Sequence, residues 1–562
     1  MSASANEFQV AVIGFGPSGA VATSLLGAHG IRTLAIDRER QVYDKPRAIA
    51  LDHEILRLFD NFGVADALYQ HIAPFPASEH FGAEGQLIRR IDIIAEPYPL
   101  GYTPTMVFTQ PPAEEALRAH AWSYPSVTVE LGTELTQLSQ TVSGVTLALA
   151  GDDGAPRRVT ADYVIACDGA SSGVRRQLGI VFDDLDFDEP WLVVDLRIKE
   201  AALARLPRTA AQFCDPARPS SYIVGPALHR RFEIMLLPGE DPRAMEQSDS
   251  VWRLLARWLT PDDATLWRAA SYRFHALVAS KWRVGRVFLA GDAAHQQPPF
   301  IGQGMCQGIR DVANLVWKLE HRLQGRSGEA LLDTYEQERS AHVRELTTRI
   351  KAIGRVICER DPVAAAARDA RILAEGGGKP RTITRQEIVP PLACGLLATT
   401  PHAANGTLFP QPWVATSGGR ALLDAACGVG WRLVLRADGA LACARAIVTQ
   451  AAALGLSVIR IAPAGADVAP RAVHEEHGVV TRWFDQHASV AAIVRPDHYV
   501  YGVAHEEAAL ADMLSELARR LQSTDENENN TRGKSCQHHR MRPAEAERGP
   551  LPCSSCCSCS RH

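Results

Sequence analysis

The sequence predicts an α/β fold in which a parallel sheet is interrupted by an antiparallel sheet and followed by a third, C-terminal unit. Three observations lead to this prediction. A short apolar strand, a glycine turn and a small-residue helix occupy residues 9–30, and a second apolar strand follows at 33–37. Residues 183–280 contain the alternating strands typical of an antiparallel sheet. Four further strand candidates and a closing helix lie between 393 and 522.

Composition narrows the class of partner. The 562 residues carry 59 basic and 64 acidic side chains, a formal net charge of −5, so neither nucleic acid nor anionic lipid would meet a strongly positive surface. The uncharged stretch 8–31 is broken by glycines and a proline and lacks a preceding basic region, so no membrane segment is expected. Seven of the twelve cysteines are scattered singly, which indicates a reducing, cytoplasmic setting. We expect a small-molecule partner and no metal.

The first element carries a recognisable phosphate-binding pattern. The run G-F-G-P-S-G directly follows a strand and opens a helix, where glycines allow a tight turn, approach of a pyrophosphate and close helix packing. Asp37 ends the next strand, 18 residues beyond Gly19, where an acid can bind ribose hydroxyls. A glycine turn without a ligand is the alternative. The predicted dinucleotide-binding residues here are Gly14, Phe15, Gly16, Pro17, Ser18, Gly19, Asp37 and Arg38.

Two later segments point to one dinucleotide. The segments 167–179 (CDGASSGVRRQLG) and 285–320 (GRVFLAGDAAH and its continuation) resemble the paired DG and GD motifs of the flavin-dependent aromatic hydroxylases, which are single-component FAD monooxygenases. The resemblance implies that Asp292, with Gly291, binds the ribityl chain and that Asp168 supports the pyrophosphate region. It also implies that the backbone N–H groups of Gly304 and Met305 face the flavin, although the G-Q-G turn could be only a helix cap.

Further positions follow from the same resemblance. Arg47 and Gln110 match residues that contact the ribityl chain and flavin, and Arg118 matches a phosphate-side arginine. Pro299 matches a proline whose carbonyl accepts a hydrogen bond from the substrate hydroxyl. Taken singly, each of these could instead be a surface, cap or turn residue.

The resemblance extends to one branch of that family, the 3-(3-hydroxyphenyl)propionate hydroxylases, through segments such as 188–196, 213–225, 408–412 and 482–502. It implies ortho-hydroxylation of 3-(3-hydroxyphenyl)propionate or 3-hydroxycinnamate, with NADH and O2 as co-substrates, through a C4a-hydroperoxide of the flavin. It also implies a thioredoxin-like C-terminal domain, which here lacks C-x-x-C and so has no thiol redox role. Residues 296–301 and 305–307 depart from the branch pattern, which leaves the substrate open.

The groups that act on the substrate are only partly indicated. His275 and Tyr222 are candidates for the base that helps the phenol ionise, because both lie on strands of the predicted substrate sheet; structural roles in those strands are the alternative. Arg218, Arg230 and Arg231 are candidates for binding a substrate carboxylate, with solvent-facing roles as the alternative.

The expected organisation has six parts. These are an FAD-binding domain at 1–182, a substrate-binding antiparallel sheet at 183–280, the return of the FAD-binding domain with long helices at 281–375, a linker at 376–392, the thioredoxin-like domain at 393–522 and a disordered tail at 523–562. A zinc knuckle formed by the tail's Cys553, Cys556, Cys557, Cys559 and His562 is the less favoured alternative for that tail.

Rival functions remain. A phenol, resorcinol or polyketide hydroxylase would share the fold, and a non-catalytic flavoprotein that senses an aromatic ligand is the alternative outside enzymology. A flavin halogenase is disfavoured because no W-x-W-x-I-P segment occurs. A small phenolic acid is the expected partner, and a homodimer is allowed for.

Overall fold

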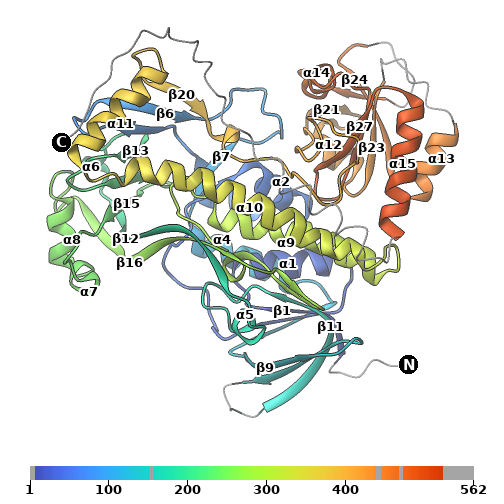
Figure 1. Cartoon of the computed structure of the whole chain (residues 1–562), viewed down its shortest axis with the longest axis horizontal. Coiled ribbons are helices and arrows are strands. Elements are labelled where there is room, and N and C mark those ends of the chain that lie inside the picture. Colours follow the sequence, from blue (N-terminus) through green and yellow to red (C-terminus); the bar gives the residue numbers. More distant parts are fainter. Residues whose placement is uncertain (1–6, 152–153, 155, 438–444, 467–471, 523–562) are drawn as a thin grey trace, which may run out of the picture.

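The computed structural model describes residues 7–151, 154, 156–437, 445–466 and 472–522. Its strands form sheets of eight, nine, seven and three strands. In Figure 1 the first sheet lies at the bottom, the nine-stranded sheet at the left and the C-terminal unit, coloured orange to red, at the upper right. The long helices α9 (Gly304–Leu323) and α10 (Ala330–Ile357) run between them. The tail at 523–562 and the zinc knuckle considered for it lie outside the described residues.

The first sheet has the parallel core that the N-terminal motif predicts. Strand β1 (Glu7–Ile13) lies between two parallel neighbours and is apolar because both faces of its central part are buried. The glycine turn and the acid at position 37 therefore meet at one edge, where the parallel strands end. The order of the main path is β17 (Arg283–Val284), β18 (Val287–Leu289), β11 (Pro156–Ala166), β1, β2 (Thr33–Asp37) and β8 (Val127–Leu131), with β10 (Val145–Ala150) and β9 (Glu134–Gln140) extending from β11.

The second sheet is antiparallel through its centre, where two long strands, β12 (Phe182–Ile198) and β16 (Ala264–Ala279), pair along most of their length. Its order is β19 (His295–Gln296), β16, β12, β15 (His229–Met235), β14 (Ser220–Val224), β13 (Ala210–Phe213), β5 (Ser78–Phe81), β6 (Leu87–Asp92) and β20 (Arg381–Thr384). Four of its strands, β5, β6, β19 and β20, come from outside 183–280.

The segment 376–392 differs from the expected linker. Its residues 381–384 form β20, which pairs in parallel with β6, so that Ile383 lies opposite Ile91 and packs against the apolar cluster around it. The Gly- and Pro-rich residues just before it have linker composition, but the β-branched residues that follow are good strand formers. The segment thereby fixes the start of the C-terminal unit to the nine-stranded sheet.

Helices and a small sheet complete the first two regions. Besides α9 and α10, the described helices of these regions are α1 (Pro17–Ala28), α2 (His53–Asn61), α3 (Ala65–Leu68), α4 (Gln110–Trp122), α5 (Gly173–Gln177), α6 (Glu200–Leu203), α7 (Pro242–Met245), α8 (Ser248–Leu255) and α11 (Pro362–Glu375), with 3₁₀ turns η1 (Tyr69–His71), η2 (Gly291–Ala293) and η3 (Arg385–Glu387). The small sheet comprises β3 (Ala50–Asp52), β7 (Thr105–Phe108) and β4 (Ile72–Pro74).

The C-terminal unit is a sheet covered on both faces. Its strands, in spatial order, are β22 (Gly419–Leu422), β21 (Trp413–Thr416), β25 (Val473–Glu475), β24 (Ser457–Pro463), β23 (Arg432–Arg436), β26 (Ala491–Val494) and β27 (Val500–Ala504). Its helices are α12 (Leu423–Cys427), α13 (Arg445–Ala453), α14 (Val479–Gln486) and α15 (Glu507–Gln522). Apolar residues of α13 and α15 pack in one cluster with the sheet and those of α14 in another, which gives the three-layer arrangement of a thioredoxin-like domain.

Buried charged groups join this unit to the rest of the chain. Glu338 of α10 binds Arg495 at 2.7 Å and Lys318 at 2.8 Å, and Arg495 also binds Asp497 at 2.7 Å. Burial alone would raise the pKa of Glu338, but the two cations hold it well below its ordinary value. We call these four residues the junction cluster.

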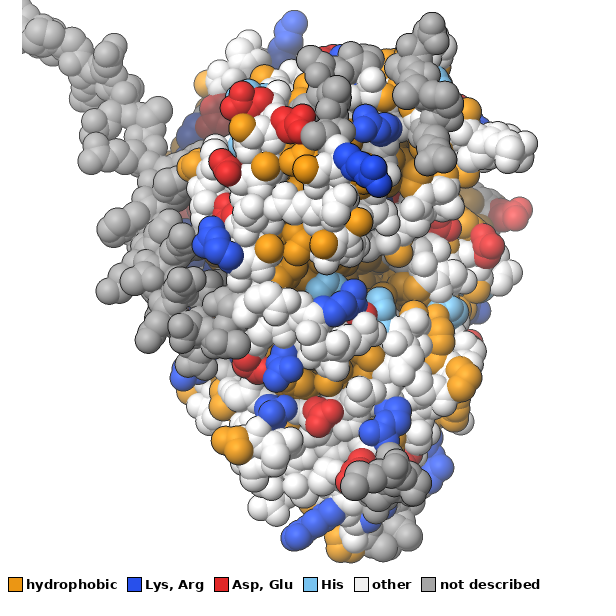
Figure 2. All heavy atoms as spheres, turned by 90° about the vertical axis from the view of Figure 1, so that its right-hand side faces the viewer, with side chains coloured by type: hydrophobic (Ala, Val, Ile, Leu, Met, Phe, Trp, Pro, Cys, Tyr) orange, Lys and Arg blue, Asp and Glu red, His pale blue; other side chains and the backbone are white. Residues whose placement is uncertain are grey.

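The surface shows no segregation of charge on the face seen in Figure 2, which looks onto the side of the C-terminal unit. Lys and Arg side chains are interspersed there with Asp and Glu side chains among the coloured residues. Among the described helices, none combines the length and apolar character needed to cross a bilayer.

Candidate active site

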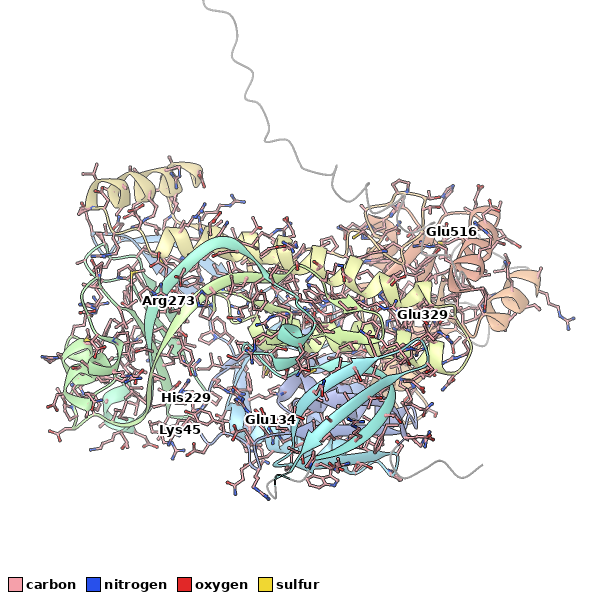
Figure 3. The ribbon with its side chains drawn as sticks, turned by 60° about the horizontal axis from the view of Figure 1, so that its bottom comes forward. Lys45, Glu134, His229, Arg273, Glu329 and Glu516 are labelled. Carbon is pink, nitrogen blue, oxygen red and sulfur yellow. The ribbon has the colours of Figure 1, made fainter. Side chains whose placement is uncertain are left out.

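A cavity of about 580 Å³ opens where the ends of the parallel strands face the antiparallel sheet. The turns after the parallel strands line one side, and β12, β14, β15 and β16 line the other. Arg231 of β15 donates to the carbonyl oxygens of Arg47 and Pro46, which ties this wall to the 45–47 segment; Figure 3 shows Lys45 and His229 in that region.

The glycine turn fits a phosphate cradle. A side chain at Gly14, whose φ is 93°, would come within 2.4 Å of the Cys167 carbonyl oxygen, and one at Gly19 within 1.9 Å of the Gly14 carbonyl oxygen. Nothing lies within 4 Å of the corresponding position at Gly16, which lines the cavity with Pro17 and Ser18. Helix α1 starts here without an acidic residue in its first turn or a side-chain cap, so its N–H groups are available to an anion.

Asp37 shapes the turn from the next strand. Its two carboxylate oxygens accept hydrogen bonds from the N–H groups of Phe15 and Glu39, both at 2.8 Å. Arg118 lies over the Phe15 ring at 5.5 Å and reaches within 3.7 Å of Asp37. Arg38, in contrast, is largely exposed beside Glu39 and does not line the cavity.

Gln110 and Arg47 lie at the next part of the rim. The Gln110 side-chain oxygen accepts hydrogen bonds from the N–H groups of Arg47 and Ala48, while its amide donates to Glu114 at 3.0 Å. This fixes the backbone of the 47–48 segment against the cavity. The Arg47 side chain is half exposed there, 3.9 Å from Glu114, and is free to turn toward a bound phosphate or sugar.

The GD turn brings a carboxylate into the cavity. Gly291 has a φ of 62°, and its N–H donates to Asp311 of α9 at 2.9 Å. The Asp292 side chain is open to the cavity, but the surrounding protein raises its pKa, an effect that His295 and Arg47 oppose. Asp168 lies behind the lining: one oxygen accepts the Val174 N–H at 3.0 Å, and the other is buried with no hydrogen-bond partner in the described part of the chain.

Helix α9 presents its N-terminus to the same cavity. Gly304 and Met305 line the cavity, and the first turn has neither an acidic residue nor a side-chain cap. The preceding Gln303 turns its side chain away, to Asp52 and Arg310. Two uncapped helix ends, an open glycine turn and a carboxylate therefore converge on one cavity, and this set fits a pyrophosphate joined to a ring system that takes up negative charge.

The opposite side of the cavity carries a cluster of aromatic and aliphatic side chains. Phe274 stacks on the buried Trp191 at 5.3 Å between ring centroids, and Phe300 meets both rings edge-on. A wall of this kind suits a flat aromatic ring and excludes water from it. The apolar side chains of this wall include Phe75, Ile91, Val193, Ile223, Phe274, Phe300 and Ile301.

The structure separates the catalytic candidates. Pro299 and His275 line the cavity, and the His275 ring lies 3.3 Å from Asp188. Tyr222 is fully buried on the other face of β14, against Phe232, because its neighbour Ile223 faces the cavity and strand side chains alternate. Tyr222 therefore cannot touch a substrate in this cavity, and the prediction that it acts as the base is not supported.

The three candidate arginines for a carboxylate are also engaged elsewhere. Arg218 forms a two-pronged pair with Glu240, and Arg230 donates to backbone carbonyl oxygens; neither lines the cavity. Arg231 does line it, but its guanidinium binds Asp195 and the 46–47 backbone. Arg231 thus builds the wall rather than offering a free charge.

Sequence reasoning missed four charged residues that line the cavity: Glu233, Arg268, Arg273 and Arg385. Arg268 and Arg273 lie within ion-pair distance of Asp195 and Asp188, respectively. Glu233 is 5% exposed, has no hydrogen-bond or ion-pair partner among the described residues, and burial raises its pKa to about 7. Arg385, from the expected linker, is 6% exposed and has no acidic partner within ion-pair distance in the described chain. For Glu233 the available signal was a charge inside the apolar strand RRFEIMLL; Arg385 had no local signal.

Comparison with known proteins identifies two regions of the chain. Residues 7–350 match the family model described as FAD binding domain, and residues 406–520 match the HcaD C-terminal domain. A probable NADH-specific resorcinol 4-hydroxylase of Rhodococcus jostii is 37% identical, over 90% of this chain and 94% of that protein. A 3-(3-hydroxy-phenyl)propionate/3-hydroxycinnamic acid hydroxylase of Burkholderia vietnamiensis is 35% identical, over 88% of this chain and 93% of that protein.

Solved structures show the same fold. The flavin-dependent monooxygenase PieE, in complex with FAD and substrate, covers 92% of this chain with a TM-score of 0.76 and 21% identity. Aklavinone-11 hydroxylase, in a ternary complex with FAD and aklavinone, covers 92% with a TM-score of 0.73 and 24% identity. The predicted fold class is confirmed. With its FAD-binding domain, aromatic-lined cavity and HcaD-type C-terminal domain, this chain belongs to the FAD-dependent aromatic hydroxylases.

Proposed function

We propose that the protein adds one hydroxyl group, ortho to an existing phenol, to a 3-hydroxyphenyl acid such as 3-(3-hydroxyphenyl)propionate or 3-hydroxycinnamate, with NADH and O2 as co-substrates. The observation that carries this proposal is that the glycine turn and helix ends that fit a dinucleotide line the same cavity as an aromatic cluster. The relatives named as 3-(3-hydroxy-phenyl)propionate hydroxylases support this substrate class.

Bound FAD would supply the oxygen chemistry, and the chain would position and activate the ring. Gly16 and the start of α1 would hold the pyrophosphate, Asp292 the ribityl chain, and the start of α9 the flavin ring. Phe274 and Phe300 would keep water from the reacting face.

The phenol needs a base, because a phenolate directs electrophilic attack to its ortho carbon. Glu233 suits this role: its carboxylate faces the cavity, has no partner among the described residues, and has a pKa near neutral pH. In the step we propose, the phenol O–H bond breaks, the proton moves to Glu233 and the electron pair stays on the phenol oxygen. Pro299 lies on the same lining; its carbonyl oxygen already accepts the Gly302 N–H at 2.7 Å, so a substrate hydroxyl would use its second lone pair.

The test is NADH oxidation by the FAD-loaded enzyme across a panel of phenols, with product analysis under ¹⁸O2. Consumption of NADH should be slow alone and rise by orders of magnitude with 3-(3-hydroxyphenyl)propionate, giving a catechol that carries one labelled oxygen. The methyl ether should not react, because it cannot lose a phenolic proton. A product hydroxylated elsewhere on the ring, or no product, would contradict the proposal.

Resorcinol hydroxylation is the second candidate, because one relative carries that name at 37% identity. If resorcinol exceeds the phenylpropionate in kcat/KM by tenfold or more, the substrate assignment is wrong while the hydroxylase activity stands. A flavoprotein that only senses aromatic ligands would consume no NADH in response to any phenol in the panel.

A further inference from the structure

The charged groups that line the cavity are not equivalent. Arg231 and Arg268 approach Asp195, at 2.7 and 3.6 Å, and Arg273 binds Asp188. Arg47 is half exposed at the rim beside Glu114. Within the described part of the chain, Arg385 is the cavity-lining arginine that has no carboxylate within ion-pair distance.

Arg385 is also held firmly in place. It begins the 3₁₀ turn η3 directly after β20, whose pairing with β6 anchors it to the substrate sheet. Arg349 of α10 donates to the carbonyl oxygens of Glu387 and Ile388, at 3.3 and 3.2 Å. The Arg385 guanidinium lies over the Phe75 ring at 5.1 Å, and its position is therefore set before any ligand arrives.

A buried cation without a carboxylate partner is unfavourable. Burial lowers the pKa of Arg385 to about 10, although Cys306 and Asp52 oppose the shift. Asp52 does not relieve the charge, because its carboxylate binds Arg310. The side chain still carries its proton at neutral pH, and its Nε atom is buried without a hydrogen-bond acceptor among the residues that the structure describes. The cavity thus holds an unsatisfied positive charge whose natural complement is an anion.

We propose that Arg385 binds the carboxylate of the aromatic substrate and makes the enzyme selective for phenolic acids over neutral phenols. This inference rests on the proposed function, since it assigns the acid end of that substrate to one residue. Arg385 and Glu233 then divide the recognition: the arginine holds the acid end, and the glutamate faces the phenol end. A guanidinium suits this task because its planar fork matches the two oxygens of a carboxylate.

The anion could instead be the cofactor, because Arg385 Nη2 lies near the backbone of Gly302, just before the start of α9. The experiment therefore compares Arg385→Met and Arg385→Lys on two matched substrates, 3-(3-hydroxyphenyl)propionate and its neutral amide. Arg381→Met is the control, because it makes the same chemical change on an exposed residue four positions earlier, outside the cavity lining.

We expect Arg385→Met to lower kcat/KM for the acid by about a hundredfold, mainly through KM, and for the amide by less than threefold. Arg385→Lys should recover part of the loss for the acid, and Arg381→Met should change neither value. The melting temperature of Arg385→Met should equal or exceed that of the wild type, because an unpaired buried charge is removed. Equal losses for acid and amide would overturn the proposal in favour of a cofactor or structural role, and no loss for the acid would also overturn it.

A binding measurement separates this inference from the proposed function. The FAD-loaded protein is titrated by calorimetry with 3-phenylpropionate, which has the carboxylate but no phenol and cannot be hydroxylated by the proposed route. Wild type should bind it, and Arg385→Met should bind it at least tenfold more weakly even if no phenol in the panel is turned over. Equal affinities of the two proteins would reject the role of Arg385, whatever the activity assays give.

Discussion

Charged side chains are buried in two regions: the junction between the FAD-binding domain and the C-terminal unit, and the cavity. The two regions differ in whether these charges have partners. In the junction cluster, Glu338 has two cationic partners, and Arg495 has two carboxylate partners. In the cavity, Glu233 and Arg385 have no charged partner within ion-pair distance among the described residues. The junction satisfies its charges internally, whereas the cavity keeps two charges that a ligand can satisfy.

This difference separates structural from functional burial. A satisfied buried pair is costly to break, because removing one member leaves the other uncompensated. An unsatisfied buried charge already lowers stability, so removing it need not destabilise the protein. Its burial shifts the pKa of the group and leaves it able to bind an oppositely charged ligand. Removing charges in the two regions should therefore affect different properties: stability at the junction, and binding or turnover in the cavity.

The largest effect on stability is expected at the junction. Glu338→Gln should lower the free energy of unfolding by about 3 to 5 kcal/mol, because Lys318 loses its carboxylate partner and Arg495 keeps only Asp497. Denaturant unfolding measures this. The control is Glu345→Gln, which removes an exposed pair with Arg349 and should cost less than about 0.5 kcal/mol. Similar losses of stability in the two variants would contradict the claim that the buried junction cluster stabilises the protein more than an exposed ion pair does.

Replacing Glu233 should lower the turnover rate and change its dependence on pH. Glu233→Gln should lower kcat by about a hundredfold or more and abolish a rise of kcat/KM with pH whose midpoint lies near 7, since the base must be ionised. His275→Asn, which alters the other candidate base in the cavity, should leave that midpoint in place. If instead the midpoint disappears in His275→Asn and persists in Glu233→Gln, His275 is the base.

The raised pKa of Glu233 also predicts how the free energy of unfolding depends on pH. The folded protein binds this proton more tightly than the unfolded chain, because burial raises the pKa of Glu233 from 4.5 to about 7. Its contribution to the free energy of unfolding is therefore fully present below pH 4.5 and lost as pH rises to 7, by about 3 kcal/mol. Unfolding measured across this range should show the loss in wild type relative to Glu233→Gln. Parallel pH profiles would contradict the raised pKa.

Replacing Asp292 should weaken the binding of FAD. Asp292→Ala should weaken FAD binding about ten- to a hundredfold, or about 1.5 to 3 kcal/mol, if the carboxylate accepts a hydrogen bond from the ribityl chain. Fluorescence titration of the apoprotein with FAD measures the dissociation constant. Asp292→Asn keeps an acceptor oxygen and should lose less. Unchanged FAD affinity in Asp292→Ala would exclude this contact.

The smallest effect is expected for Tyr222→Phe. Its hydroxyl is buried near Arg230 without a hydrogen bond of good geometry among the described residues, and the ring packs in the core behind the cavity wall. The free energy of unfolding should change by less than about 0.5 kcal/mol, and kcat/KM should stay within twofold. A tenfold fall in kcat/KM would restore Tyr222 as a candidate catalytic residue.

The same contrast explains what the sequence could predict. The cofactor side consists of short strand, turn and helix motifs, and each of Gly14, Asp292 and Gly304 follows from residues next to it in the chain. The substrate side depends on which strand face meets the cavity, and that requires the register of β14 and β15 with their neighbours. Alternation alone could not decide between Tyr222 and Ile223. Arg385 enters through β20, whose pairing with β6 spans about 290 residues of sequence.

The most direct test of the central claim is a crystal structure of the enzyme with FAD and 3-(3-hydroxyphenyl)propionate, without NADH. The account predicts the substrate carboxylate paired with the Arg385 guanidinium at hydrogen-bond distance, about 2.7 to 2.9 Å, and the phenol oxygen directed toward Glu233. It would be contradicted by a carboxylate bound to another cation, or by Arg385 bound to the cofactor while the substrate lies elsewhere.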